Sequence, residues 1–249
     1  MVFIYFSGTG NSKHIAKMFC RNMNVPCHSI EDEIDFTQLI ESVEVIGFCY
    51  PIYGSRLPRI MREFIERHKQ ALEHKKLIIF CTQMIPLGDG TRNFTKYLRP
   101  TSAKVIYAER FLMPNNINNV IFFPLYNDKA IKKSLTNAEK KMKKVCENIK
   151  KDRTVRRGFD PVSIMLGSLQ GAMLPLIEKI GRKRVWINGD CSKCGLCIST
   201  CPMKNFANYN GTITTQNNCT LCFRCINKCP KKAISILRRG KVKKQYKGI

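Results

Sequence analysis

The sequence is short of acidic side chains, of histidine and of long hydrophobic runs. It has 18 Asp and Glu residues against 43 Lys and Arg, and only 4 histidines. None of these histidines, His14, His28, His68 and His74, has carboxylates clustered near it, so the sequence predicts no acid–base dyad and no catalytic residue. No segment approaches the roughly 18 apolar residues that a membrane-spanning helix needs, and Met1 leads directly into an apolar run without a charged leader. We therefore expect a cytoplasmic protein.

The charge is unevenly distributed along the chain. Residues 1–50 hold 3 basic and 6 acidic side chains, whereas residues 201–249 hold 11 basic and none acidic. Such a basic surface attracts acidic proteins, nucleic acid or anionic lipid without selecting among them. The basic run over residues 238–247 is most simply a solvated tail.

Cysteine is abundant and clustered. Eight of the 13 cysteines lie between Cys191 and Cys229. In a cytosolic chain such crowding indicates metal ligation and not disulfides. The other five stand singly in apolar or helical surroundings and are interpreted as small core residues: Cys20, Cys27, Cys49, Cys81 and Cys146.

The first 150 residues alternate between strand-like and helix-like segments, which is typical of a parallel sheet covered by helices. Strands are predicted at residues 2–6, 27–30, 43–50, 77–82 and 104–112, and helices at 12–22, 36–42, 59–70, 91–98 and 129–151. Residues 114–128 have no clear period and are interpreted as an insertion or a split last strand.

Residues 152–184 form a predicted connector with basic ends around the apolar stretch 162–180. Gly167, Gly171 and Pro175 interrupt this stretch, so one long helix is not expected. The connector is either a helical linker packed between two domains or a membrane-surface segment with basic flanks.

A cysteine motif with the spacing C-x2-C-x2-C-x3-C-P occurs twice, once at Cys191, Cys194, Cys197, Cys201 and Pro202, and again at Cys219, Cys222, Cys225, Cys229 and Pro230. The two-residue spacings allow one loop to place three thiolates around a four-iron cubane, while the fourth cysteine binds the cluster of the other run. One 4Fe-4S cluster is thus assigned to Cys191, Cys194, Cys197 and Cys229, and the other to Cys219, Cys222, Cys225 and Cys201. Zinc is the alternative, but a four-ligand site built from paired C-x2-C motifs leaves the third and fourth cysteine of each run unexplained.

Residues 185–235 therefore resemble a bacterial two-cluster ferredoxin domain, a small α+β unit. The resemblance implies electron transfer, because a cubane held by four thiolates has no open iron for a substrate. Ferredoxins are typically acidic, however, and this segment is strongly basic, which leaves its docking partner undetermined.

A glycine loop follows the first predicted strand: Ser7, Gly8, Thr9, Gly10, Asn11 and Ser12. Free amides at a helix start, with hydroxyls nearby, stabilise a phosphate. The loop lacks the Gly-Lys-Ser/Thr ending of a Walker loop and the third glycine of a dinucleotide loop. A helix N-cap with turn glycines and no ligand is the other interpretation.

The loop resembles the phosphate loop of flavodoxins, which implies an FMN site and a flavodoxin-like, doubly wound sheet of order 2-1-3-4-5. The same resemblance places the flavin ring between the loops after the third and fourth strands, with Tyr53 as the side chain that could stack on it. The corresponding residues are Pro51, Ile52, Tyr53 and Gly54 in one loop and Thr82 and Gln83 in the other.

Together the two halves resemble the flavodoxin–ferredoxin fusion family of anaerobic bacteria and archaea, the EFR-type ferredoxins. The domains expected are 1–151 (flavodoxin-like, FMN), 152–184 (helical connector) and 185–249 (two-cluster ferredoxin with a basic tail). The favoured function is electron transfer between FMN and two 4Fe-4S clusters, with an acidic redox protein as partner. The alternatives are an FMN-dependent reductase of a small oxidised substrate and, less favoured, a redox sensor on nucleic acid or an anionic membrane. The oligomeric state is not predicted.

Overall fold

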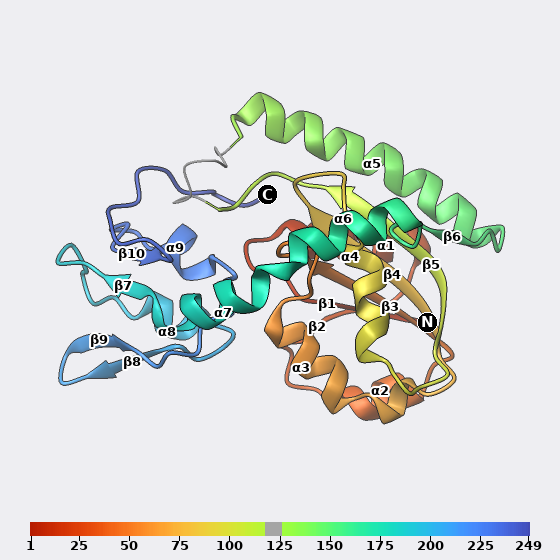
Figure 1. Cartoon of the computed structure of the whole chain (residues 1–249), viewed down its shortest axis with the longest axis horizontal. Helices are drawn as coiled ribbons and strands as arrows, with labels where there is room; N and C mark the ends of the chain where they lie inside the picture. Colours follow the sequence, from red (N-terminus) through yellow and green to blue (C-terminus); the bar gives the residue numbers. More distant parts are fainter. Residues whose placement is uncertain (118–125) are drawn as a thin grey trace.

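A six-stranded parallel sheet forms the N-terminal unit of the chain (Figure 1). The computed structural model describes residues 1–117 and 126–249, so most of the predicted insertion at 114–128 lies outside the described residues. The strand order is β2-β1-β3-β4-β5-β6. The strands are β1 (Val2–Tyr5), β2 (Cys27–Ser29), β3 (Val45–Pro51), β4 (Lys76–Gln83), β5 (Lys104–Leu112) and β6 (Val155–Arg156).

The predicted order of the first five strands is confirmed, and β6 extends the sheet by one strand. β6 runs parallel to β5 and pairs Val155 with Tyr107. Its two residues are too few for an alternating pattern, and the arginines around it are typical of a surface segment, so the sequence predicted a connector there. The pairing shows that the sheet continues beyond residue 151.

Helices cover both faces of the sheet, because its strands alternate their apolar side chains between the two sides. In β1, Phe3 packs into the core beneath α1 (Asn11–Met23) and α5 (Asp128–Lys150), while Ile4 packs into the core on the opposite face. That opposite face is covered by α2 (Phe36–Glu41), α3 (Arg59–Arg67), the 3-10 turns η1 (Gln70–Leu72) and η2 (Phe94–Tyr97), and α4 (Gly90–Asn93).

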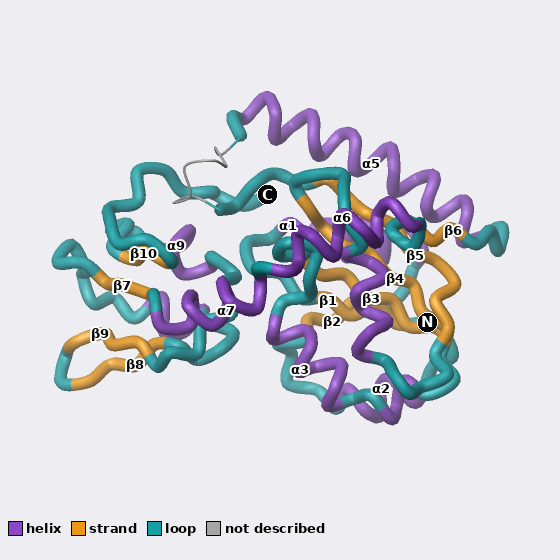
Figure 2. The backbone as a smooth tube through the Cα atoms, in the orientation of Figure 1, coloured by secondary structure: helices purple, strands orange, loops and turns teal. Residues whose placement is uncertain are grey.

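The connector forms two successive helices, α6 (Pro161–Ala172) and α7 (Leu174–Lys183). Figure 2 shows them running from the sheet towards the C-terminal unit. The break falls at Met173, two residues before Pro175 in the first turn of α7. Gly167 and Gly171 do not break α6 but lie buried inside it. No helix in residues 1–117 or 126–249 is long and apolar enough to cross a membrane.

The C-terminal unit is small and has its own core. It consists of β7 (Val185–Ile187) paired antiparallel with β10 (Ile234–Ile236), the hairpin of β8 (Phe206–Tyr209) and β9 (Thr212–Thr215), and the short helices α8 (Leu196–Thr200) and α9 (Arg224–Lys228). The buried residues Ile226, Ile234 and Ile236 lie at its centre.

The two cysteine runs repeat in backbone conformation as well as in sequence. Positive φ angles occur at Lys193 (58°) and again 28 residues later at Leu221 (59°). They also occur at Gly195 (76°) and Phe223 (57°), the residues before α8 and α9. L-residues rarely adopt this conformation, so its recurrence at matched positions shows that both loops fold in the same way.

We expect Gly47 to be required for packing between β3 and β1. Gly47 pairs with Phe3, and a Cβ at residue 47 would overlap the Phe3 ring. Gly47→Ala should therefore lower the free energy of unfolding by about 1–3 kcal/mol in denaturant titrations followed by circular dichroism. At Gly189 an added Cβ meets nothing within 4 Å, so Gly189→Ala is the control. Equal stability of the two variants would contradict this packing.

Candidate functional site

The glycine loop connects β1 to α1 at the carboxyl edge of the sheet, where ligands bind in open parallel sheets. The Gly10 amide donates to the Ser7 hydroxyl at 3.1 Å, and Gly10 adopts a φ of 113° that favours glycine. Helix α1 begins at the next residue and has no acidic side chain in its first turn. Its amides and dipole therefore favour an anion at this point.

A cavity opens beside this loop and gathers four of the segments at the carboxyl edge of the sheet. Of the twelve cofactor-binding residues predicted from the sequence, ten line it: Ser7, Gly8, Thr9, Asn11, Ser12, Pro51, Ile52, Tyr53, Thr82 and Gln83. The other two lie outside. Gly10 lines a neighbouring cavity, together with Lys13 and Lys247, and Gly54 lies against the carbonyl of Gln170.

The segment after β5 also lines this cavity and was missed from the sequence. It contributes Met113, Pro114, Asn115, Asn116 and Ile117. It is fastened to the glycine loop, because the Asn11 amide donates to the Pro114 carbonyl at 2.8 Å and the Asn116 amide donates to the Thr9 hydroxyl at 2.8 Å. Its position after the predicted strand 104–112 could have indicated this, since every loop that follows a strand of a parallel sheet lies at the same edge.

Several polar side chains of the glycine loop hold neighbouring loops in place. The Ser12 and Thr82 hydroxyls are hydrogen-bonded at 2.7 Å, which joins the first turn of α1 to the end of β4. The side-chain oxygen of Asn11 accepts from the Tyr246 hydroxyl at 2.6 Å. The Asn11 side chain is thus engaged on both ends.

The basic C-terminal segment packs back onto the protein. Val242 and Tyr246 are buried, and the Tyr246 amide donates to the Asn227 side chain at 2.7 Å. The side-chain amide of Gln245 donates to the backbone carbonyl of Cys229 at 2.7 Å. A solvated tail does not describe this segment, because its apolar residues hold it between the glycine loop and α9.

Helix α6 covers the loops beside the cavity. The Ser55 hydroxyl donates to the Gln170 side chain at 2.7 Å, and the Arg56 guanidinium donates to the Gly171 carbonyl at 3.4 Å. A Cβ at Gly54 would lie 3.0 Å from the Gln170 carbonyl oxygen, so the backbones approach closely there. The connector therefore fixes the loop after β3 and is more than a tether.

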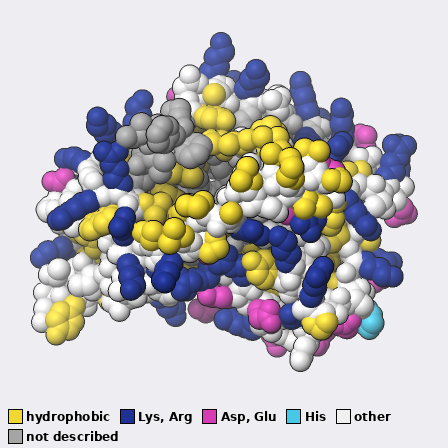
Figure 3. Space-filling model, in the orientation of Figure 1, with side chains coloured by type: hydrophobic (Ala, Val, Ile, Leu, Met, Phe, Trp, Pro, Cys, Tyr) yellow, Lys and Arg dark blue, Asp and Glu magenta, His cyan; other side chains and the backbone are white. Residues whose placement is uncertain are grey.

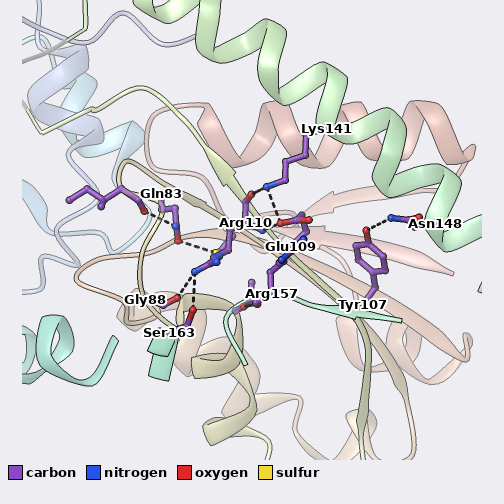
Figure 4. A network of polar contacts seen from close by, with 12 residues as sticks. Gln83, Gly88, Tyr107, Glu109, Arg110, Lys141, Asn148, Arg157 and Ser163 are labelled. Atoms are coloured by element: carbon purple, nitrogen blue, oxygen red, sulfur yellow. Dashed lines mark hydrogen bonds and ion pairs between the residues drawn. The ribbon is translucent and has the colours of Figure 1, made fainter. Parts of the chain in front are cut away.

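A polar network on β5 fixes the loop after β4 (Figure 4). Arg110 donates to the Gly88 carbonyl at 2.8 Å and to the Ser163 hydroxyl of α6 at 3.4 Å. Lys141 of α5 donates to the Arg110 carbonyl at 2.6 Å and pairs with the buried Glu109 at 2.9 Å. Because Arg110 contacts both the loop and α6, it holds the two together.

The eight clustered cysteines line two cavities in the C-terminal unit. One is lined by Cys191, Cys194, Cys197 and Cys229, and the other by Cys201, Cys219 and Cys222, with Cys225 between the two. The last cysteine of each run thus faces the cavity of the other run. All thirteen cysteines lie in the described residues and are free of disulfides. Among those residues, no three histidine, cysteine or acidic side chains converge on a position for a single metal ion.

Backbone amides point at the sulfurs of both runs. The amides of Asn205 and Ala233 donate to Cys201 and Cys229 at 3.3 Å each, again at positions 28 residues apart, and the Leu221 amide donates to Cys219 at 3.3 Å. Such bonds favour the thiolate form. Burial opposes them and raises the pKa of Cys219 to about 12 and of Cys222 to about 11. The second run is thus the more buried, and Cys194 of the first is exposed.

The glycine loop and the second cysteine run touch each other. A Cβ at Gly8 would overlap the carbonyl oxygen of Cys222, so this contact requires glycine. Arg224, two residues later, donates to the carbonyls of Ser7 and Gly8 at 2.7 and 3.0 Å and forms a two-pronged ion pair with Glu31 at 2.6 Å. No motif in the sequence indicated this role of Arg224.

Tyr53 lies between the first cavity and the cysteines. Its side chain lines the cavity, while its hydroxyl is fully buried. Burial raises the pKa of Tyr53 well above its ordinary value, and the nearby Cys222 and Cys219 raise it further. The phenol therefore stays neutral at physiological pH.

Comparisons with known proteins concern the N-terminal unit. Residues 2–155 match a family model described as a flavodoxin domain. A flavodoxin of Megasphaera elsdenii has 21% identity over 57% of this chain and 99% of its own, with a TM-score of 0.40. General stress protein 14 of Treponema denticola, solved in complex with FMN, has 13% identity over 59% and 97%, with a TM-score of 0.43. Flavodoxin 2 of Bacillus cereus has 16% identity over 55% and 93%, with a TM-score of 0.36. No curated protein matches the chain.

We expect the Arg224–Glu31 pair to hold the glycine loop against the C-terminal unit. In a double-mutant cycle with Arg224→Met and Glu31→Gln, the coupling energy for local opening should be about 2 kcal/mol, because both side chains are largely shielded from solvent. Amide hydrogen exchange of residues 7–12 measures this opening.

The control is the exposed pair of Lys241 and Asp190, whose atoms are 3.0 Å apart. Its coupling on the same amides should stay under about 0.5 kcal/mol, because exposed pairs contribute little. Equal coupling in the two cycles would show that Arg224 does not fasten the loop.

Proposed function

The chain belongs to the flavodoxin domain family through residues 2–155, and from this premise we propose that it is an electron-transfer protein carrying FMN and two 4Fe-4S clusters. The proposed domains are the flavodoxin-like unit 1–151, the connector 152–184 and a two-cluster ferredoxin unit 185–249. One observation carries the proposal. Gly8, which lines the cavity at the carboxyl edge of the sheet, touches Cys222, which lines the nearer cysteine cavity.

The cavity beside the glycine loop fits FMN in its donor groups. Its lining has hydroxyls at Ser7, Thr9 and Ser12, faces the start of α1 and contains no acidic side chain. A phosphate therefore meets amides and hydroxyls without an opposing carboxylate. Ile52, Tyr53 and Met84 supply the apolar and aromatic contacts that a flavin ring needs.

The two cysteine cavities fit cubane clusters in their donor sets. Each is lined by three cysteines of one run and the last cysteine of the other, as this spacing requires. Their walls are largely apolar, with Ile187, Ile213 and Ile234 around one and Phe206 and Ile236 beside the other. Amide-to-sulfur hydrogen bonds and exclusion of water tune the reduction potential of such clusters.

When bound, FMN exchanges electrons singly or in pairs, whereas a cubane cluster exchanges them one at a time. The protein's own residues supply the positions. Tyr53 and Gly8 separate the flavin cavity from Cys219 and Cys222, so we infer that this cluster is the flavin-side one. The cluster of the first run, with the exposed Cys194, is then the one that faces a partner. Lys193 and Lys231 are exposed on this unit, which suits an acidic redox protein.

Anaerobically purified protein should contain about 8 iron and 8 sulfide atoms, with about one FMN. The crosswise ligation makes pairs of cysteine variants distinguishable. Cys201→Ser with Cys219→Ser affects one cluster and should leave about 4 iron atoms, whereas Cys201→Ser with Cys191→Ser affects both and should leave almost none.

The matched control is Cys146→Ser, which changes a buried core cysteine and should keep the full iron content. Ligation within each run would reverse the results of the two double variants. Bound zinc in place of iron would refute the cluster assignment.

The two clusters should differ in their role in electron transfer from the flavin. Stopped-flow reduction of the Cys191→Ser/Cys194→Ser variant should still show electrons passing from the flavin to the remaining cluster. The Cys201→Ser/Cys219→Ser variant should lose rapid transfer, because the cluster that it retains lies on the solvent side. Equal transfer in both variants would contradict the proposed order, in which the cluster of the second run receives electrons from the flavin first. Saturable turnover of a small oxidised substrate would favour a reductase.

A further inference from the structure

The connector exposes a stripe of large apolar side chains that the fold does not bury. Val162, Met165 and Leu169 of α6 are 61%, 64% and 75% exposed, and Met173 and Leu176 continue the line at 58% and 51%. Successive members are three or four residues apart, so they share one face of the two helices. Figure 3 shows hydrophobic side chains gathered on the face of the molecule over which α6 runs. We call these five residues the connector stripe.

Helix α6 turns small residues inward and large apolar residues outward, which is the reverse of most surface helices. Its buried face consists of Ser163, Gly167 and Gly171. A Cβ at Gly167 would overlap Asp89, and one at Gly171 would overlap the Arg56 side chain. The helix thus packs on the sheet domain through small residues against polar groups. Surface helices normally turn their large apolar residues inward, so the connector stripe faces outward for a reason other than folding.

The exposed charges around the connector stripe are mainly basic. Arg156 and Arg157 are exposed just before α6, and Lys179 and Lys183 are exposed on α7. Glu178 is the single acidic residue in 161–184, and it is buried in an ion pair with Arg62 at 2.6 Å. Asp160, which caps α6 by accepting from the Ser163 amide at 2.9 Å, is exposed at the start of the helix. The exposed surface of α6 and α7 therefore combines apolar and basic groups with a single opposing carboxylate at one end.

We propose that α6 and α7 dock the protein on an anionic lipid bilayer. Residues 161–183 lie along the surface of the protein, and a helix of this kind rests in the plane of the membrane with its apolar face in the headgroup region. The cations lie at both ends of the connector stripe and none within it, so lysine and arginine reach lipid phosphates while methionine and leucine enter the apolar layer. An acidic protein surface matches the charges but leaves the apolar centre without a partner.

Docking in this way brings the proposed redox site to the membrane. Gln170 of α6 is hydrogen-bonded to Ser55 and lies against Gly88, in loops that stand beside the flavin cavity. The bilayer would lie against the opposite face of the same helix. The membrane contact itself needs neither flavin nor clusters, so it is tested separately from the electron-transfer proposal.

Vesicle sedimentation of the intact holo-protein tests the proposal. The protein should bind phosphatidylcholine vesicles that contain phosphatidylglycerol and bind weakly to phosphatidylcholine alone, with binding reduced by salt. Met165→Ser with Leu169→Ser should lower the partition coefficient at least about tenfold, because the variant removes two exposed side chains that the lipid would bury. Lys179→Gln with Lys183→Gln should weaken binding mainly at low salt.

Tyr209→Ser is the matched control, because Tyr209 is 70% exposed on the hairpin of β8 and β9. It should bind vesicles like the wild type. Iron and flavin content, measured on each variant, shows whether it folds normally. Anionic vesicles that do not bind the wild type would overturn the proposal, as would binding that Met165→Ser/Leu169→Ser leaves unchanged. A wild-type dimer in sedimentation equilibrium that this double variant dissociates would show that a second copy covers the connector stripe.

Discussion

The rest of the site depends on the contact between Gly8 and the carbonyl oxygen of Cys222. Two backbones meet there without room for a Cβ, so the glycine loop and the second cysteine run approach as closely as two chains can. Arg224 secures the contact by donating to both Ser7 and Gly8 while its charge is neutralised by Glu31. An arginine buried in this way requires such an acid, because an unpaired charge is costly to remove from water. The geometry at one peptide thus sets the spacing between the two proposed cofactor sites.

The connector also fixes loops at the carboxyl edge of the sheet, those after β3 and β4. It contributes β6 to the sheet, and its helix α6 then crosses the loops after β3 and β4. There α6 is hydrogen-bonded to Ser55 and Arg56 of the loop after β3. Arg110 joins the same helix to the loop after β4. Loops at the edge of a parallel sheet are otherwise free to move. Here they are held by a helix whose inner residues are small enough to let it lie close.

Several features were predictable because they depend on local pattern. Buried strands such as 104–112 have the apolar content that a parallel sheet requires, and the cysteine spacing indicated which side chains belong together. Other features depend on contacts across the chain. The two-residue β6 has no period, the segment at 113–117 has no motif, and Arg224 is one of 43 basic residues in the sequence. Asn11 lines the cavity as predicted, but no motif indicated the hydrogen bonds of its side chain with Pro114 and Tyr246.

The sequence by itself determined the alternating α/β pattern, the phosphate-type loop at residues 7–12 and the twofold cysteine motif, because each is set by neighbours within a few residues. Only the tertiary structure decided that Gly8 touches Cys222 and that α6 turns its apolar side outward. Each of these depends on which surfaces meet, and that depends on the packing of side chains far apart in the sequence. The same loop and the same cysteines on units held apart would not share the wall that Gly8 and Cys222 form between the two proposed cofactor sites.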